Sequence, residues 1–221
     1  MAIALLPLIA ILLGLGIWQV ERRAWKLALI ERVERGLATA PVPAPGPAEW
    51  AGVNTEATYR RVRVTGNYLS CRTKLTQAVT ELGPGKWVMT PLLTDRGFTV
   101  FVNRGFLPEG KALPNCKSAA AKPVSITGLL RLSEPKGGFL RANDPAAGRW
   151  YSRDVAAMGQ GLPQLAPYFI DADRSGDGWP RGGMTVIRFA NNHLVYALTW
   201  FGLALLTAWF AWRAWCSRGG E

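Results

Sequence analysis

The hydrophobic residues of this chain are concentrated in two uninterrupted runs, one near each end. Residues 2–20 and residues 194–212 each contain nineteen residues without a single charge. At ~1.5 Å of rise per residue, a helix of this length reaches about 28 Å, close to the ~30 Å hydrocarbon core of a bilayer. A backbone in lipid must satisfy its own hydrogen bonds, so both runs predict membrane-spanning helices.

Each run has an alternative interpretation. The first could be a cleaved signal peptide, but no basic residue precedes it and no small-residue cleavage site follows it. The second could be a buried core helix, but Trp209, Trp212 and Trp215 lie where an aromatic belt at the membrane interface is expected. We therefore expect both runs to be retained spans.

The pattern changes twice between the two runs. The helical period continues through 21–37, where Leu27, Ile30 and Val33 recur at three-residue steps, and prolines 41, 43, 45 and 47 then indicate an extended linker at 38–58. From Tyr59 onward apolar and polar residues alternate, which is typical of strands. The predicted elements are strands at 59–65, 87–93, 98–103, 124–132, 168–171 and 185–189, a hairpin loop at 94–97 and a short helix at 154–158.

This order of elements predicts a membrane protein in which two transmembrane helices flank an extramembrane domain at 59–190, with a tail at 213–221. The domain is expected to be α+β and mainly antiparallel β, either barrel-like or sandwich-like.

The charge balance narrows the choice of partners. The chain has 26 basic and 15 acidic residues, a net charge of +11. Such a surface suits anionic lipid head groups or an acidic protein partner. No zinc finger, RNA-recognition motif or basic zipper is present, so nucleic acid is not an expected partner.

Three cysteines are present, and none forms a C-x-x-C pair. Cys71 and Cys116 could form a disulfide if the domain faces an oxidising compartment, but connectivity cannot be read from a sequence. Cys216 lies beyond the second span and cannot reach either of them.

Candidate chemistry centres on His193, the single histidine, at the start of the second span. It could be an axial ligand to a metal or haem iron, or a polar residue that caps a helix at the interface. Residues 171–177 resemble a calcium loop, but Gly182 occupies the position where a glutamate is required, which favours an ordinary turn. With one histidine and no nucleotide-binding motif, we expect no enzymatic activity.

Several sequence blocks occur in a fixed order over nearly the whole chain. They are 15–19, 85–92, 102–108, 150–154, 167–172 and, most specific of all, 185–202. Together with the two flanking spans, these blocks resemble the surfeit-locus (Surf/Shy) family of cytochrome c oxidase assembly proteins. The segment 69–74 departs from the family pattern, because it lacks the usual histidine and acidic residue, so Cys71 inherits no family role.

The resemblance implies an assembly factor for haem-copper (cytochrome c) oxidase that aids haem a delivery to, or insertion into, subunit I. Its implied partners are cytochrome c oxidase subunit I, haem A synthase and membrane lipid, and the implied ligand of the haem iron is His193. We expect Tyr196, Trp200 and Phe201 to bury the haem ring. Arg188 or Arg181 could bind the propionates, or could equally anchor lipid head groups.

The resemblance also implies a location. It places the protein in the bacterial inner (cell) membrane as a multi-pass protein with a periplasmic main domain, or in the mitochondrial inner membrane if the source is eukaryotic. Arg22, Arg23 and Lys26 follow the first span on the domain side, and this local charge would by itself favour a cytoplasmic domain. We follow the resemblance, since the charge rule weakens for long loops.

The sequence leaves two other functions open. The chain could be a membrane-anchored scaffold that holds oxidase subunits without binding a cofactor. It could also be a membrane-anchored enzyme, which the thin catalytic inventory disfavours.

Overall fold

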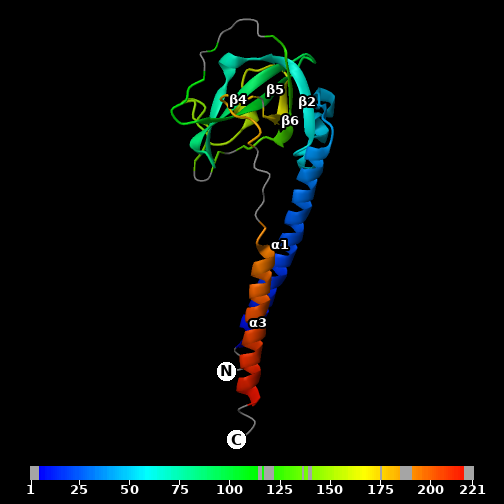
Figure 1. The fold of residues 1–221 in the computed structure, drawn as a ribbon, viewed down its shortest axis with the longest axis vertical. Coiled ribbons are helices and arrows are strands. Elements are labelled where there is room, and N and C mark those ends of the chain that lie inside the picture. Colours follow the sequence, from blue (N-terminus) through cyan, green and yellow to red (C-terminus); the bar gives the residue numbers. More distant parts are fainter. Residues whose placement is uncertain are drawn as a thin grey trace. The chain divides into compact units, whose positions relative to one another are not determined.

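The computed structural model describes residues 5–113, 116, 122–135, 137–138, 141–174, 176–184 and 191–216, without the side chains of Leu37 and Ala214. The chain divides into a helical unit formed by residues 1–33 and 186–221, and a β-rich unit formed by residues 34–185. Figure 1 shows the long helices and the sheet that make up these units.

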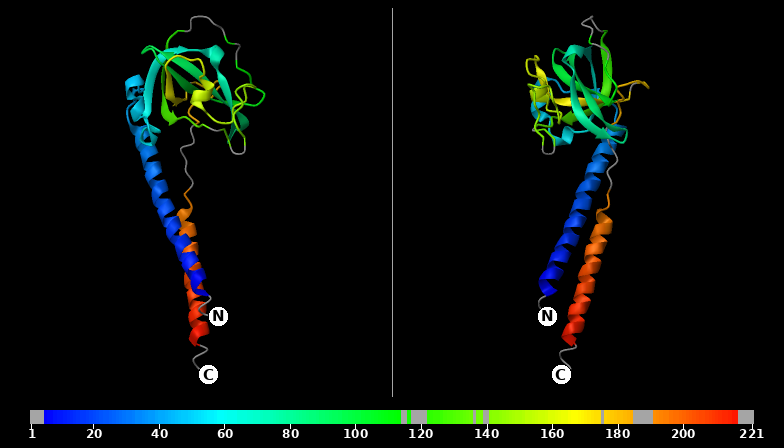
Figure 2. Two further views of the ribbon diagram at one scale, coloured as in Figure 1. Left: turned by 180° about the vertical axis from the view of Figure 1, so that it is seen from behind. Right: turned by 90° about the vertical axis from the view of Figure 1, so that its left-hand side faces the viewer.

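The helical unit contains most of α1 (Leu6–Ala38) and all of α3 (His193–Cys216). The two helices lie side by side and run in opposite directions in every view (Figures 1 and 2). Leu12 of α1 and Ala197 and Ala204 of α3 are buried, and a Cβ atom at Gly16 would collide with the ring of Phe201. Small residues at these positions permit close approach of two helices.

Among the described residues, one helical segment is long and apolar enough to cross a membrane, namely the 21 residues His193–Arg213 of α3. This agrees with the predicted second span. The first predicted span includes residues 2–4, which lie outside the described part, so that span stays a prediction. One unbroken helix, α1, covers residues 6–20 of this run and the helical extension at 21–37.

Five strands of the β-rich unit close into a barrel. They are β2 (Arg61–Tyr68), β6 (Val124–Leu132), β7 (Leu165–Ala172), β5 (Thr99–Pro108) and β4 (Gly83–Thr94), in that order around the ring, and pairing of β2 with β4 completes it. All neighbours in the ring are antiparallel except β5 and β7, which are parallel. Of the two predicted architectures the barrel is therefore correct, with mixed rather than uniform strand directions.

Two short strands extend the ring. Strand β1 (Val42–Pro43) pairs with β2, and β3 (Lys74–Thr80) pairs with β4. The proline-rich segment that precedes the barrel is in contact with it, since Ala44 is buried in the barrel core and the Tyr168 hydroxyl donates a 2.7 Å hydrogen bond to the carbonyl oxygen of Pro45.

Alternation of side chains builds two cores on opposite faces of the strands. Residues from all five ring strands, among them Val64, Val102 and Ile170, fill the barrel interior. Phe101 and Phe169 point the other way and pack with Trp150 outside the barrel, beneath the short helix α2 (Val155–Met158). Strand β5 is therefore buried on both faces, which explains its nearly continuous apolar sequence.

The structure confirms most of the predicted elements. The strands predicted at 59–65, 87–93, 98–103, 124–132 and 168–171, the loop at 94–97 and the helix at 154–158 correspond to β2, β4, β5, β6, β7, the β4–β5 turn and α2. The strand predicted at 185–189 falls outside the described residues. Strands β1 and β3 were not predicted. Cys71 and Cys116 form a disulfide, with their Cα atoms 5.1 Å apart.

Candidate functional site

His193 is the first residue of α3, and its side chain is held by α1. Its Nδ1 atom lies 2.7 Å from Oε1 of Gln19. Because an amide oxygen only accepts hydrogen bonds, Nδ1 is the donor, and the lone pair of the neutral ring is then on Nε2. A second residue that fixes the tautomer of a histidine is a common feature of histidines that ligate metals.

The neighbouring aromatic residues follow His193 at helical spacing. Tyr196 and Trp200 are three and seven residues further along, so both lie on the same side of α3 as His193. Tyr196 is exposed, whereas Trp200 is partly buried and its Nε1 donor has no hydrogen-bond partner in the described residues. The side of α3 around His193 therefore offers one imidazole lone pair, two aromatic rings and one unused N–H donor.

Of the two predicted arginines, the structure describes only Arg181. Arg188 lies outside the described residues. Arg181 belongs to the β-rich unit, where its guanidinium carbon lies 5.1 Å from the centre of the Trp179 ring and its backbone pairs with Phe106. Their role toward a propionate stays a prediction.

Gln19 is a residue that inspection of the sequence did not single out as functional. It is only 9% exposed, although it lies on a helix whose apolar side chains are largely exposed. The sequence did contain a signal for Gln19, namely a polar residue inside a predicted span. Such a residue needs a hydrogen-bond partner within the protein more than a polar residue exposed to water does.

A network of charged residues lies on the outer face of the barrel strands, on the same side as Phe101 and Phe169. Asp171 is 4% exposed and accepts hydrogen bonds from Asn103 at 2.8 Å, Arg131 at 3.0 Å and Arg153 at 3.4 Å. Arg153 also binds both carboxylate oxygens of Glu134, at 2.9 Å and 2.5 Å. Asn103, Arg153 and Asp171 come from three of the sequence blocks named above, 102–108, 150–154 and 167–172, so these blocks converge on one cluster.

The electrostatics of this cluster favour its charged form. Burial lowers the pKa of Arg153, but its hydrogen bond to Glu134 and the charges of Asp171 and Glu134 outweigh burial and raise that pKa above its usual value. Every member of the cluster has a partner of opposite charge or an amide, so it is satisfied internally. We interpret the cluster as structural.

Two aspartates of the segment 171–177 also form ion pairs with arginines. Asp173 pairs with Arg61 at 2.7 Å, and Asp177 pairs with Arg174 at 2.6 Å. Within the described ranges no group of three or more His, Cys, Asp or Glu side chains could hold a metal ion. That this segment forms an ordinary turn rather than a calcium loop stays a prediction.

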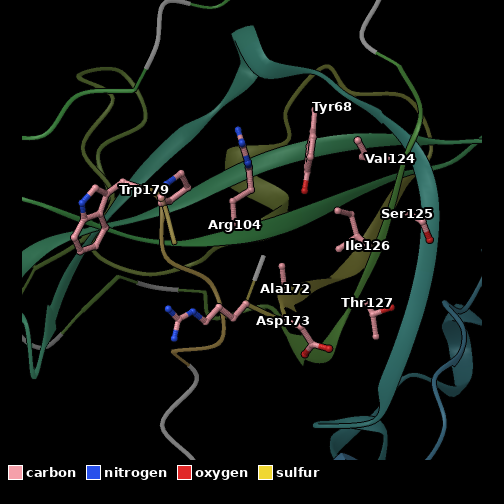
Figure 3. Close-up of a pocket in the computed structure, with 12 residues that line it drawn as sticks. Tyr68, Arg104, Val124, Ser125, Ile126, Thr127, Ala172, Asp173 and Trp179 are labelled. Carbon is pink, nitrogen blue, oxygen red and sulfur yellow. The ribbon is translucent and has the colours of Figure 1, made fainter. Parts of the chain in front are cut away.

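The β-rich unit also has a cleft of about 550 Å³ at the ends of several barrel strands (Figure 3). Its lining includes Tyr68, Arg104, Ile126, Asp173 and Trp179. The Arg104 guanidinium carbon lies 4.9 Å from the centre of the Tyr68 ring. Burial raises the pKa of Tyr68, against the opposing effect of Arg104, so its hydroxyl is neutral at physiological pH.

Comparison with known proteins gives a consistent result. A sequence model of the SURF1 family matches residues 6–205. The chain is 36% identical to Surfeit locus protein 1 of Mus musculus over 220 residues, which cover 89% of this chain and 70% of the mouse protein. It is 35% identical to Surfeit locus protein 1 of Homo sapiens, covering 89% and 72%. It is 34% identical to a SURF1-like protein of Monosiga brevicollis, covering 92% and 83%.

Proposed function

The chain belongs to the SURF1 family, whose members are assembly factors of cytochrome c oxidase, and we propose that it serves oxidase assembly by binding haem a through His193. The observation that carries this proposal is the hydrogen bond between Gln19 and His193. It leaves Nε2 as the lone-pair atom of a neutral imidazole, which is the form that ligates iron.

The other groups around His193 fit the same ligand. The rings of Tyr196 and Trp200 offer apolar surface for a macrocycle, and the buried Nε1 donor of Trp200, which has no partner among the described residues, would satisfy a polar substituent. Haem a would supply the redox-active iron, whereas the residues of this chain bind and orient it. We propose that the bound haem is destined for subunit I of the oxidase and arrives from haem A synthase.

The proposed location is supported by the apolar character of the two long helices. Segment His193–Arg213 is apolar and long enough to span a membrane. Large apolar side chains of α1, including Ile11, Ile17 and Trp18, are more than half exposed, which supports lipid contact for this helix as well. We propose a two-span protein of the inner membrane with the β-rich unit on the periplasmic side, or on the equivalent side in mitochondria.

Haem content tests the proposal directly. The full chain is co-expressed with a haem A synthase, purified in detergent, and examined by its optical spectrum. We expect haem a in the wild type and at least a tenfold lower content in His193→Ala, with Asn192→Ala as the neighbouring control that keeps its haem. Equal haem in wild type and His193→Ala would show that His193 is not the ligand.

Gln19 provides a second, independent variant. In Gln19→Leu the imidazole is still present but its tautomer is no longer fixed, so we expect weaker haem binding, by about tenfold, with partial recovery in Gln19→Asn. If both Gln19 variants retain full haem content, the contact with His193 has no role in ligation.

The alternative function, a scaffold without cofactor, makes a different prediction. A scaffold would restore oxidase assembly in a deletion strain while remaining free of haem, and His193→Ala would restore it equally well. If the haem a proposal is correct, His193→Ala restores less oxidase than the wild type at equal protein abundance.

A further inference from the structure

Two cationic residues of α1 lie on the same side of this helix as Gln19. Arg23 and Lys26 are four and seven residues beyond Gln19, and the 3.6-residue turn of an α-helix places all three on one side. Gly16, where a Cβ atom would collide with the Phe201 ring of α3, is also on this side. The two cations therefore continue the side of α1 that faces α3, and all of these residues belong to the helical unit.

The start of α3 lies level with Gln19. His193 is the first residue of α3, and its Nδ1 atom is 2.7 Å from Oε1 of Gln19. Because the two helices run in opposite directions, α1 continues past the start of α3 (Figures 1 and 2). With a rise of 1.5 Å per residue, Arg23 and Lys26 are about 6 Å and about 10 Å beyond Gln19 along the axis of α1.

His193 therefore lies between an aromatic part and a cationic part of the helix pair. Tyr196 and Trp200 follow it along α3, within the segment that is apolar and long enough to cross a membrane. The two cations of α1 lie beyond it in the opposite direction. Haem a has the same two-part character, because its ring is apolar and its two propionates are charged. A haem ligated by His193 matches these residues in one orientation, with its propionates directed away from the apolar segment.

The described residues leave these two cations without a carboxylate. Of the 15 acidic residues of the chain, only Glu221 lies outside the described part, and it follows the far end of α3 in the sequence. None of the described carboxylates forms an ion pair with Arg23 or Lys26, although both residues are partly buried. A partly desolvated cation without a counter-ion is well suited to receive an anionic ligand.

We propose that Arg23 and Lys26 bind the two propionates of haem a and thereby set the orientation of the haem on His193. Arg23 offers a planar fork of donors that matches a carboxylate, and Lys26 offers a compact positive charge. This proposal rests on the proposed ligation of haem a by His193 and adds the residues that orient the ligand. It assigns the propionates to α1 rather than to Arg181 or Arg188, the two residues expected from the sequence.

Esterification of the propionates tests the proposal without relying on oxidase activity. The full chain is purified free of haem in detergent and titrated with haem a and with its dimethyl ester, whose carboxyl groups carry no charge. We expect the wild type to bind the free acid at least about tenfold more tightly than the ester, because the ester cannot form charge-assisted hydrogen bonds. Equal affinity for the two forms would overturn the proposal.

Substitutions identify the residues that produce this preference. Arg23→Gln and Lys26→Gln should each reduce the preference to about threefold or less, whereas Arg23→Lys should keep part of it. Arg32→Gln is the matched control, because Arg32 is exposed and lies on the opposite side of α1 from Gln19, so it should keep the wild-type preference. The preference is a ratio measured on one variant, so partial loss of folded protein does not change it. If both glutamine variants keep the full preference, Arg23 and Lys26 do not bind the propionates.

A lipid phosphate is the other anion that this pair of cations suits. Phosphatidylglycerol that co-purifies with the protein is therefore measured in the wild type and in the Arg23→Gln, Lys26→Gln double variant. We expect the double variant to lose the preference for the free acid. If it keeps that preference and loses bound phosphatidylglycerol instead, the pair binds a lipid head group and the proposal is wrong.

His193→Ala separates the propionate proposal from the ligation proposal. If the wild type binds acid and ester equally and His193→Ala binds neither, ligation by His193 stands and only the propionate assignment fails. If the wild type binds neither form, both proposals fail. Loss of the preference in Arg188→Gln, with Arg23→Gln and Lys26→Gln unchanged, would return the propionates to a residue expected from the sequence.

Discussion

At the residue scale, Asp171 is the acceptor on which the cluster of charged residues on the outer face of the barrel depends. Its carboxylate receives Asn103, Arg131 and Arg153 while only 4% of the residue is exposed. Loss of one partner of a buried ion cluster leaves the remaining charges desolvated and uncompensated, which typically costs about 3–5 kcal/mol. The pair formed by Arg174 and Asp177 has the same chemistry, but its carboxylate side chain is 93% exposed.

We therefore predict that Asp171→Asn lowers the free energy of unfolding by about 3 kcal/mol. Asp177→Asn is the matched control and should cost less than about 1 kcal/mol, because solvent screens an exposed pair. Urea unfolding of the full chain, followed by near-UV circular dichroism, measures both. Similar values for the two variants would show that burial does not set the strength of the cluster.

Tyr168 gives a prediction about pH. Its side chain is fully buried and its hydroxyl donates to the Pro45 carbonyl, and burial raises the pKa of this hydroxyl above its usual value near 10. The folded state thus keeps the proton when the unfolded state has already lost it. The stabilisation is present in full below pH 10 and is lost as pH rises above 10.

Tyr168→Phe should accordingly be less stable than the wild type by about 1 kcal/mol at pH 7, because one hydrogen bond is lost. Between pH 10 and pH 11 the difference should shrink by up to about 1.4 kcal/mol, since only the wild type has this tyrosine to ionise. Unfolding curves at pH 7, 10 and 11 provide the measurement. A difference that stays constant over this range would contradict the prediction.

At the element scale, the helical unit depends on close approach of α1 and α3. A side chain at Gly16 would meet the ring of Phe201, whereas nothing lies within 4 Å of a side chain built at Gly14. Both glycines are on the same apolar stretch of α1, so they form a matched pair for the same substitution.

Gly16→Val should destabilise the helix pair by about 1–3 kcal/mol through overpacking, whereas Gly14→Val should have a much smaller effect. Thermal unfolding of the full chain in detergent, followed by tryptophan fluorescence, distinguishes the two variants. If they melt alike, the contact with Phe201 does not hold the helices together. Loss of haem in Gly16→Val alone would further link this contact to the geometry of His193.

The elements that the sequence predicted well are those with a strong and regular pattern. Strand β6 was predicted with its observed bounds at 124–132, because apolar and polar residues alternate and turn residues flank it. Strand β3 was missed because its inward positions are Thr76 and Ala78, and Val79 on the opposite face is 86% exposed. A strand whose apolar residues face solvent does not show the alternation of buried apolar and exposed polar residues from which strands are predicted.

Only part of the candidate site could be predicted from local sequence patterns. His193 stands out by its type and position, but its partner Gln19 is 174 residues away, and no local pattern connects them. The partner of a polar residue in a span is set by which helix faces meet, which depends on tertiary packing. The parallel pairing of β5 with β7 was also beyond local patterns, because it depends on how the barrel closes.

At the scale of the whole molecule, the three cysteines allow a test of the proposed membrane topology. Cys71 and Cys116 form a disulfide in the β-rich unit, whereas Cys216 is free and exposed at the end of α3. Disulfides persist in oxidising compartments and are rare in the cytosol. If α3 crosses the bilayer as proposed, Cys216 is on the cytosolic side.

Labelling with a membrane-impermeant maleimide tests this topology. In intact spheroplasts we expect no labelling without reductant, and labelling of two cysteines after mild reduction, both lost in the Cys71→Ser, Cys116→Ser double variant. Cys216 should react only after the membrane is permeabilised, and Cys216→Ser should remove that signal. Labelling of Cys216 in intact spheroplasts would place the end of α3 outside, so that either α3 does not cross the bilayer or the β-rich unit faces the cytosol. If the β-rich unit faces the cytosol, a disulfide could not persist there, and Cys71 and Cys116 would react without reductant once the membrane is opened. The labelling of Cys216 and the reductant dependence of Cys71 and Cys116 together decide between these arrangements.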